Sequence, residues 1–171
     1  QPGRGTQVRV ELPVPPTRSA LPVVALQEAD LSRLRVLVAD DNRTNRYILN
    51  TMLTALGVSV TLAENGQIAV DLYRPGAFDM LLLDISMPVL DGVSALAAIR
   101  AREQAAGHPP APALAVTANA MQHQVQEYLS SGFAGHVAKP FRRATLAGAL
   151  AEHAPPAPSP GKRGQAGSKS G

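Results

Sequence analysis

Polar side chains follow four short apolar runs of the sequence, each at the point where the run stops. In chain order they are Asp40 with Asp41, then Asp84, Thr117 and Lys139. A carboxylate at the end of an apolar strand is costly to bury unless a cation or a hydrogen-bond donor lies beside it. The residue types therefore predict one shared site, in which carboxylates, a hydroxyl and an ammonium compensate one another.

Three aspartates brought together repel one another and need a cation. Mg²⁺ suits such a site because it prefers oxygen ligands and binds through one or two carboxylates, a backbone carbonyl and a phosphoryl oxygen. We expect Asp40, Asp41 and Asp84 to hold it. Lys139 adds a point charge and Thr117 a hydroxyl donor, so the set can neutralise a phosphoryl group while a carboxylate attacks it. The predicted chemistry is formation of an aspartyl phosphate on Asp84.

Each of these residues has a simpler interpretation by itself. A single aspartate after a strand is more often a helix N-cap or a loop residue than a nucleophile. A single threonine or lysine after a strand carries even less information. It is the coincidence of a doublet, an aspartate, a threonine and a Lys-Pro, each after a different strand, that favours the chemical interpretation.

The sequence between these residues predicts the elements that position them. Continuous apolar runs such as 36–39 are typical of strands covered on both faces, and Gly57 is placed to end the helix that precedes it. Strands are expected at 36–39, 58–62, 80–83, 114–116 and 135–138, and helices near 48–56, 66–74, 93–102, 121–131 and 142–153. Five strand–helix units in series predict an α/β fold, a doubly wound parallel sheet with helices on both faces. Functional groups gather at the carboxyl ends of such strands.

Composition excludes several classes of protein. A chain of 171 residues with 45% hydrophobic residues is expected to form one domain with tails. It has no cysteine, which excludes disulfides and thiolate chemistry, and no apolar stretch near the roughly 20 residues of a membrane span. The net charge is +3, but residues 35–153 contain nine basic and ten acidic residues. The basicity belongs to the ends, so binding to nucleic acid is not expected.

The flanking segments are predicted to lie outside the folded domain. The chain begins with Gln1 rather than methionine, so we expect a fragment of a longer protein. Residues 14–33 are rich in proline and are predicted to be a linker, with a short helical stretch near its end. The folded domain is expected to span 34–153. The proline-rich segment 154–171 has too little apolar surface to fold and is predicted to be disordered.

Four motifs carry a resemblance to a known family. They are Val38–Asn42 with Asn45-Arg46, Leu83–Pro88 with Asp91-Gly92, Val116–Ala120, and Lys139–Phe141. With these motifs the chain resembles a response-regulator receiver domain over about residues 34–153. The Asp-Asp-Asn-x-x-Asn-Arg start, the Asn-Gly-Gln turn at 65–67 and the Thr-Ala-Asn-Ala run are similar to C-terminal receivers of hybrid sensor histidine kinases. The resemblance implies a flavodoxin-like sheet with strand order 2-1-3-4-5 and Mg²⁺ as the cofactor.

The resemblance also implies a role for each matching residue. Asp84 would accept a phosphoryl group from a phosphohistidine. Asp41 would bind Mg²⁺ directly, Asp40 mainly through water, and Ser86 through its backbone carbonyl. Lys139 would pair with a phosphoryl oxygen. The chain would then phosphorylate itself and slowly lose the phosphoryl group, but it lacks the catalytic parts of a kinase.

A conformational switch is expected beside the acceptor. Thr117 supplies the hydroxyl that a phosphoryl group would draw toward itself. The family's usual aromatic partner, three residues before the lysine, is replaced by His136. A histidine there is more often a half-buried polar residue than a pH sensor, so its part in the switch is the weaker hypothesis. The resemblance further implies a cis Lys139-Pro140 bond, and it places Ser86 and Asn119 beside the phosphoryl site.

Partners are expected at the first and fourth helices. In relatives the histidine-bearing helix bundle docks beside the first helix, where Arg43, Asn45 and Arg46 would lie; solvated surface residues are the equally acceptable alternative. The partner would be a histidine-kinase dimerisation domain, a histidine phosphotransfer domain, or both. The fourth helix has apolar residues at helical spacing, which predict a core stripe: Met121, Val125, Tyr128 and Leu129.

The first residues carry a second, shorter resemblance. Gly3–Pro13 resembles the closing glycine box and last strand of a histidine-kinase ATPase domain. This assigns 1–13 to a remnant of that domain and implies a cytoplasmic location, in a parent that is a hybrid kinase. The fragment lacks the rest of an ATP pocket, so ATP binding is not expected.

Two other functions compete with the phosphoacceptor. One is a receiver-fold regulatory interaction module that is rarely phosphorylated, against which the complete set of site residues argues. The other is a phosphatase of the haloacid dehalogenase type, which also uses a strand-end aspartate and Mg²⁺. Its nucleophile lies in an Asp-x-Asp arrangement, and the adjacent pair Asp40-Asp41 lacks that spacing.

Overall fold

A computed structural model describes residues 31–118 and 121–156 of the chain. Five strands form one parallel sheet in the order β2-β1-β3-β4-β5. The strands are β1 (Arg35–Ala39), β2 (Ser59–Ala63), β3 (Met80–Asp84), β4 (Ala113–Thr117) and β5 (Gly135–Ala138). The predicted fold class and strand order are therefore confirmed.

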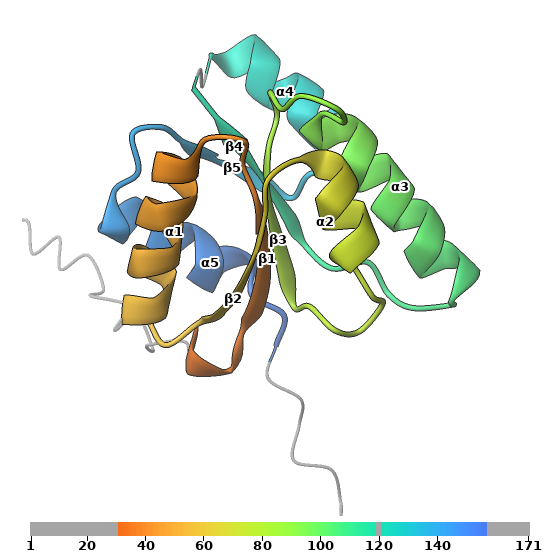
Figure 1. Ribbon diagram of the computed structural model, residues 1–171, viewed down its shortest axis with the longest axis horizontal. Helices are drawn as coiled ribbons and strands as arrows, with labels where there is room; N and C mark the ends of the chain where they lie inside the picture. The colour runs from red at the N-terminus through yellow and green to blue at the C-terminus, as the bar shows by residue number, and fades with distance from the viewer. Residues whose placement is uncertain (1–30, 119–120, 157–171) are drawn as a thin grey trace, which may run out of the picture.

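One α-helix follows each strand. The helices are α1 (Arg43–Ala55), α2 (Gly66–Leu72), α3 (Gly92–Ala105), α4 (Gln122–Ser130) and α5 (Arg143–His153), and a 3₁₀ turn, η1 (Leu31–Arg33), precedes β1. Figure 1 shows α1 and α5 on one face of the sheet and α2, α3 and α4 on the other. Two apolar clusters fill the two interfaces: Leu49, Leu53, Leu146 and Leu150 lie in one, and Tyr73, Leu96, Ile99 and Tyr128 in the other.

The starts of α1, α2 and α3 are fixed by side chains that accept hydrogen bonds from the first turn. Asn42 caps α1 by accepting from the N–H groups of Thr44 and Asn45, and Asp91 caps α3 by accepting from Ser94. Gly57 follows the end of α1 with φ +82°, as its position in the sequence predicts. Because each helix begins just after a strand ends, all the caps lie at the carboxyl edge of the sheet.

Most predicted boundaries hold within two residues, and the differences have local causes. Helix α2 ends at Leu72 because Tyr73 is extended, at ψ 132°, shortly before Pro75. Asp84 and Thr117 are the last residues of their strands rather than the residues that follow. This places both side chains deeper in the fold than loop residues would lie.

The predicted core stripe of α4 is wrong in part. Tyr128 is buried, but Met121 is 56% exposed and Leu129 40% exposed. Helix α4 packs on the edge strand β5, so only one side of the helix meets the sheet. Met121 and Leu129 therefore face outward, and Val125 is half-buried.

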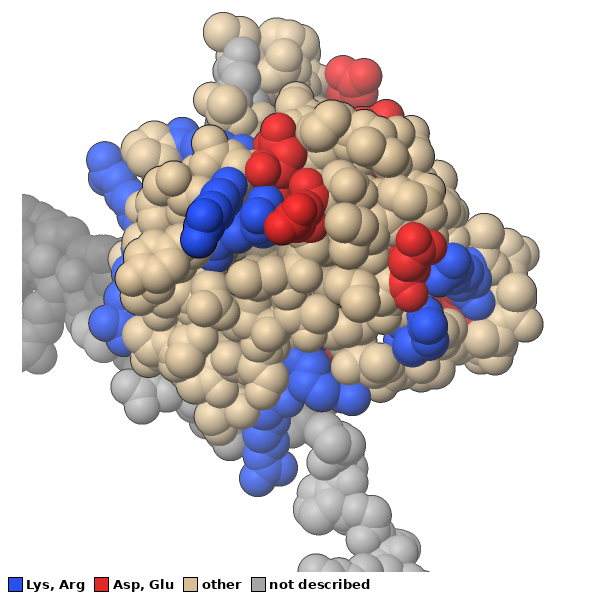
Figure 2. All heavy atoms as spheres, viewed as in Figure 1, with Lys and Arg blue, Asp and Glu red and all other residues tan. Residues whose placement is uncertain are grey.

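Charged side chains are distributed without one dominant sign on the face drawn in Figure 2. The Lys and Arg side chains there lie in several separate groups, some of them next to Asp or Glu. In the described residues, no helix combines the length and the apolar character needed to cross a bilayer. The predictions for residues 1–30, for Asn119 and for the tail beyond residue 156 lie outside the described residues.

Candidate functional site

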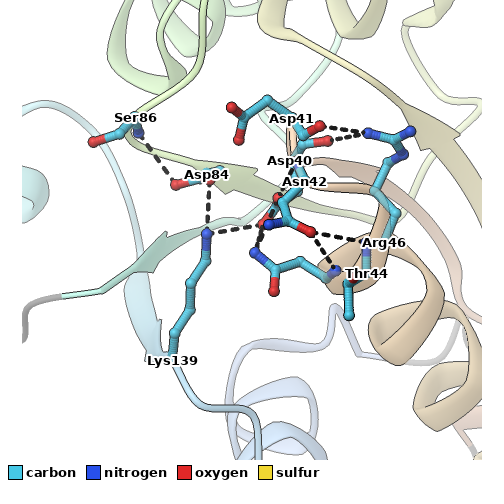
Figure 3. Close-up of polar contacts among 9 residues, drawn as sticks. Asp40, Asp41, Asn42, Thr44, Arg46, Asp84, Ser86 and Lys139 are labelled. Carbon is cyan, nitrogen blue, oxygen red and sulfur yellow. Dashed lines mark hydrogen bonds and ion pairs between the residues drawn. The ribbon is translucent and has the colours of Figure 1, made fainter.

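Strand register brings the predicted site residues to one edge of the sheet. In the parallel pairing, Ala39 on β1 is opposite Leu83 on β3, so the next residues, Asp40 and Asp84, leave their strands side by side. On the other side, β4 ends at Thr117 and β5 ends one residue before Lys139. Figure 3 shows Asp40, Asp84 and Lys139 pointing toward one another from these separate strands.

Three carboxylates meet at this edge. Oxygens of Asp40, Asp41 and Asp84 lie within 4.8 Å of one another. Asp40 is fully buried, Asp84 is 4% exposed, and Asp41 is exposed. Lys139 Nζ lies 2.8 Å from Asp84 Oδ2 and 3.0 Å from Asp40 Oδ2, so one ammonium faces two buried carboxylates. Among the described residues, none forms a hydrogen bond or an ion pair with the Asp41 carboxylate.

The electrostatics of Asp84 and Lys139 follow from this arrangement. Burial raises the pKa of Asp84 and the nearby Asp40 charge adds to the rise, although Lys139 and the Ser86 N–H oppose it. Burial lowers the pKa of Lys139, but its hydrogen bonds to Asp84 and Asp40 outweigh burial and the net pKa is raised. The lysine therefore stays charged at neutral pH, and Asp84 is a carboxylate held against a desolvation penalty.

The donor set fits a hard divalent cation. All three side chains offer carboxylate oxygens, the ligands that Mg²⁺ prefers, and three negative charges face a single positive one. The exposed Asp41 carboxylate leaves an approach from solvent. The backbone N–H of Ser86 donates to Asp84 Oδ1 at 3.1 Å, which places Ser86 in the loop directly beside Asp84, and its carbonyl as a ligand stays a prediction.

The loop after Asp84 is held close to β3. Gly92 starts α3 so near this strand that a Cβ there would lie 2.3 Å from the Asp84 carbonyl oxygen. Any side chain at this position would displace the loop or the acceptor strand. The absence of a side chain at Gly92 therefore lets the loop pack directly against β3.

The predicted switch residues lie on neighbouring strands. Thr117 is buried at the end of β4, and its carbonyl accepts a hydrogen bond from the Lys139 N–H at 2.8 Å. The Lys139-Pro140 bond is cis, as predicted. His136 is half-buried on β5 and lines a hollow against α4 together with Gln122, His123, Val125 and Gln126. Its part in a switch stays a prediction.

The predicted partner-binding residues differ in orientation. Arg43 is exposed. Asn45 Nδ2 instead lies 3.2 Å from both oxygens of Asp40, and Arg46 donates to the backbone carbonyls of Asp40 and Asp41. Contact with a partner stays a prediction for all three. The inward bonds were missed from the sequence, although the spacing of Asn45 and Arg46, one helical turn after the aspartates, is a signal for them.

The family of the chain is established by comparison with known proteins. The model of the response regulator receiver domain matches residues 36–151, which contain every site residue described above. The chain belongs to this family of two-component signalling domains.

Relatives include both hybrid kinases and single-domain receivers. The chain is 40% identical over 113 residues to hybrid signal transduction histidine kinase I of Dictyostelium discoideum, a match that spans 63% of this chain and 6% of that protein. It is 38% identical to sensor protein GacS of Pseudomonas syringae, over 66% of this chain and 12% of GacS. The chemotaxis protein CheY of Pseudomonas aeruginosa is 36% identical and matched over 90% of its length. The chain thus corresponds to a small part of the kinases and to nearly all of CheY.

Two solved structures resemble the folded domain. The receiver domain of sensor histidine kinase PA1611 from Pseudomonas aeruginosa, which has a magnesium ion in its active site cleft, is 37% identical with a TM-score of 0.61, over 70% of this chain and 96% of that one. A Saccharomyces cerevisiae complex of the histidine phosphotransfer protein Ypd1 with the receiver domain of Ssk1 gives 30% identity and a TM-score of 0.66, over 71% and 88%. The family match begins at residue 36, so it gives no support to the kinase remnant expected at residues 1–13.

Proposed function

We propose that this chain is the phosphoacceptor of a phosphorelay and takes a phosphoryl group from a phosphohistidine onto Asp84. The observation that carries the proposal is the incomplete compensation of three carboxylates by one ammonium. Asp84 is buried against Lys139, while Asp41 lies open to solvent beside it. A site that is short of positive charge is prepared for a cation and a phosphoryl group.

The reaction forms one bond and breaks one. An Asp84 oxygen attacks phosphorus, the P–N bond of the phosphohistidine breaks, and the leaving imidazole keeps the electron pair. Lys139, already 2.8 Å from Asp84, is placed to meet the charge on the phosphoryl oxygens. Asp40, Asp41, Asp84 and the Ser86 carbonyl would hold Mg²⁺, which supplies positive charge where the phosphoryl group binds. Hydrolysis by water later returns Asp84 to the carboxylate.

The partner and setting follow from the relatives. The Ypd1–Ssk1 complex is a receiver bound to a histidine phosphotransfer protein, and the hybrid kinases carry receivers within a longer chain. We infer that this receiver exchanges its phosphoryl group with a phosphotransfer domain or a kinase dimerisation domain. Its parent would then be a hybrid kinase, with this domain in the cytoplasm.

Acetyl phosphate tests the assignment without a cognate partner. Incubation with acetyl phosphate and Mg²⁺ should add one phosphoryl mass to the intact protein, as read by mass spectrometry. Asp84→Asn should give no adduct, and EDTA should suppress it in the parent. No Mg²⁺-dependent adduct on the parent, or an equal adduct on the variant, would overturn the proposal and favour an interaction module.

A further inference from the structure

The Arg46 guanidinium is bound to the backbone of the acidic loop. Arg46 lies in the first turn of α1, and its Nη1 donates to the carbonyl oxygens of Asp40 at 2.8 Å and Asp41 at 3.0 Å. Its Nη2 contacts Glu64 Oε1 at 3.2 Å, just after the end of β2. The Arg46 side chain is 12% exposed, whereas that of Glu64 is 71% exposed. Figure 3 shows the guanidinium reaching back over the loop to both carbonyls.

These bonds are unusual because three carboxylates lie nearby and Arg46 pairs with none of them. The planar fork of a guanidinium suits carboxylates as well as carbonyls, and a charged partner would give the stronger bond. Here the charged partner is Glu64, which lies outside the carboxylate cluster. Within the described part of the chain, the Asp41 carboxylate is therefore left without a cation, directly beside an arginine.

The other half of the same loop is fixed through a side chain. The Asn42 N–H donates to Asp40 Oδ1 at 2.8 Å, and Asn45 Nδ2 lies 3.2 Å from each Asp40 oxygen. The carboxylate of Asp40 is thus held directly, by the first turn of α1. Asp41 has no such contact on its carboxylate, so its orientation depends on its backbone, which is what Arg46 binds.

We propose that Arg46 is a positioning residue for the cation site. By joining the carbonyls of Asp40 and Asp41, it fixes the peptide that carries Asp41 and so keeps the Asp41 carboxylate within reach of Asp84. Glu64 holds the far end of the guanidinium, so that Arg46 does not neutralise the carboxylate it positions. This inference rests on the proposed function, because it assigns Arg46 to the Mg²⁺ site of the phosphoacceptor.

Charge and positioning predict opposite effects on cation affinity. An arginine near a cation site repels the cation, so removing its charge by itself should tighten Mg²⁺ binding. Removing a group that orients a ligand should weaken binding, by about tenfold for a partner outside the ligand shell. The sign of the change therefore separates the two roles.

Isothermal titration of the apo protein with MgCl₂ measures this sign. Arg46→Ala should weaken Mg²⁺ binding by about tenfold. Arg46→Lys keeps the charge but loses the fork that reaches two carbonyls, so it should also weaken binding, to a smaller extent. The matched control is Arg143→Ala, which removes an exposed arginine from the first turn of the neighbouring helix α5 and should leave the affinity unchanged or slightly tighter.

The outcomes distinguish this inference from the function on which it rests. Circular dichroism and thermal unfolding in EDTA establish that each variant is folded. If Arg46→Ala does not fold, the Mg²⁺ affinity of Arg46→Lys decides the question. Arg46 variants that bind Mg²⁺ as tightly as the parent, or more tightly, would overturn the positioning role and leave the proposed function intact. A parent that binds no Mg²⁺ and forms no adduct with acetyl phosphate would overturn both.

Discussion

Buried carboxylates at the two edges of the sheet are compensated to different degrees. At the amino edge, Glu103 of α3 is 2% exposed and both of its oxygens have partners. Tyr73 Oη at 2.5 Å and the Ala111 N–H at 2.8 Å donate to Oε1, and Arg100 Nη1 donates to Oε2 at 2.7 Å. Burial raises the pKa of the Tyr73 hydroxyl and the hydrogen bond to Glu103 raises it further, so the hydroxyl keeps the proton that it donates.

At the carboxyl edge, by contrast, the carboxylates have too few positively charged partners. Asp40 and Asp84 share one ammonium, Asp41 lies beside them, and desolvation leaves Asp84 with a raised pKa. A buried charge with a full set of partners stabilises one structure, whereas a cluster with too few partners retains the capacity to bind something else. The degree of compensation, rather than burial itself, separates Glu103 from the carboxylates that we propose hold Mg²⁺.

Glu103→Ala should give the largest effect on stability. The change leaves the buried Tyr73 hydroxyl without its partner and breaks the ion pair with the partly buried Arg100, so it should lower the free energy of unfolding by about 3 kcal/mol. Urea unfolding at pH 7, followed by circular dichroism, measures the loss. Phosphorylation of the folded variant by acetyl phosphate should match that of the parent.

Tyr73→Phe is the control for that comparison. It removes one hydrogen bond to a charged group and keeps the ring, so its effect should be about 1.5 kcal/mol. If Glu103→Ala lowered the free energy of unfolding by less than Tyr73→Phe does, Glu103 would not be stabilised by its full set of partners.

Asp84→Asn should raise the free energy of unfolding at pH 7, whereas the two changes at the amino edge lower it. Its native pKa is raised above the unfolded value, so the proton-linked stability is present at acid pH and is lost as pH rises through the native pKa. At pH 7 in EDTA the variant should therefore be more stable than the parent, by about 1 kcal/mol. Unfolding measured at pH 7 and at pH 4 should show the gain shrinking toward acid. A variant that is less stable than the parent at pH 7 would contradict this. It would mean that losing the ion pair between Lys139 and Asp84 costs more free energy than burying the Asp84 charge.

Much of this carboxyl edge could be predicted from the sequence. Apolar runs end at Asp40, Asp84 and Thr117, and a parallel sheet must bring such ends together, so spacing alone predicted the cluster. The resemblance to receivers added only the Ser86 carbonyl as a ligand and the separate roles expected of Asp40 and Asp41. Local motifs predicted the cluster because each of its residues lies at or just after the end of a strand.

The amino edge and the acidic loop could not be predicted in the same way. Glu103 meets Tyr73 across 30 residues, and no local pattern marks a glutamate inside a helix as buried. Arg46 was expected near a partner because a helix bundle docks beside the first helix in relatives, and its bonds to two backbone carbonyls were not predicted. Both sets of contacts involve long side chains, whose direction depends on tertiary packing.

The smallest expected effect comes from Asp79, which precedes the same strand, β3, that Asp84 ends. Its carboxylate accepts hydrogen bonds from Arg35 Nε at 3.0 Å and Nη2 at 2.9 Å, and these bonds lower its pKa against the opposing effect of burial.

Asp79→Asn should lower the free energy of unfolding at pH 7 by about 0.5 kcal/mol, because both partners are partly exposed. A lowered native pKa contributes stability above the unfolded pKa of about 3.9, and that stability is lost as pH falls through the native value. The difference between variant and parent should therefore shrink toward acid and in high salt. Two aspartates at the ends of one strand would then change stability with opposite signs at pH 7, and equal signs would contradict the contrast between the compensated edge and the functional edge.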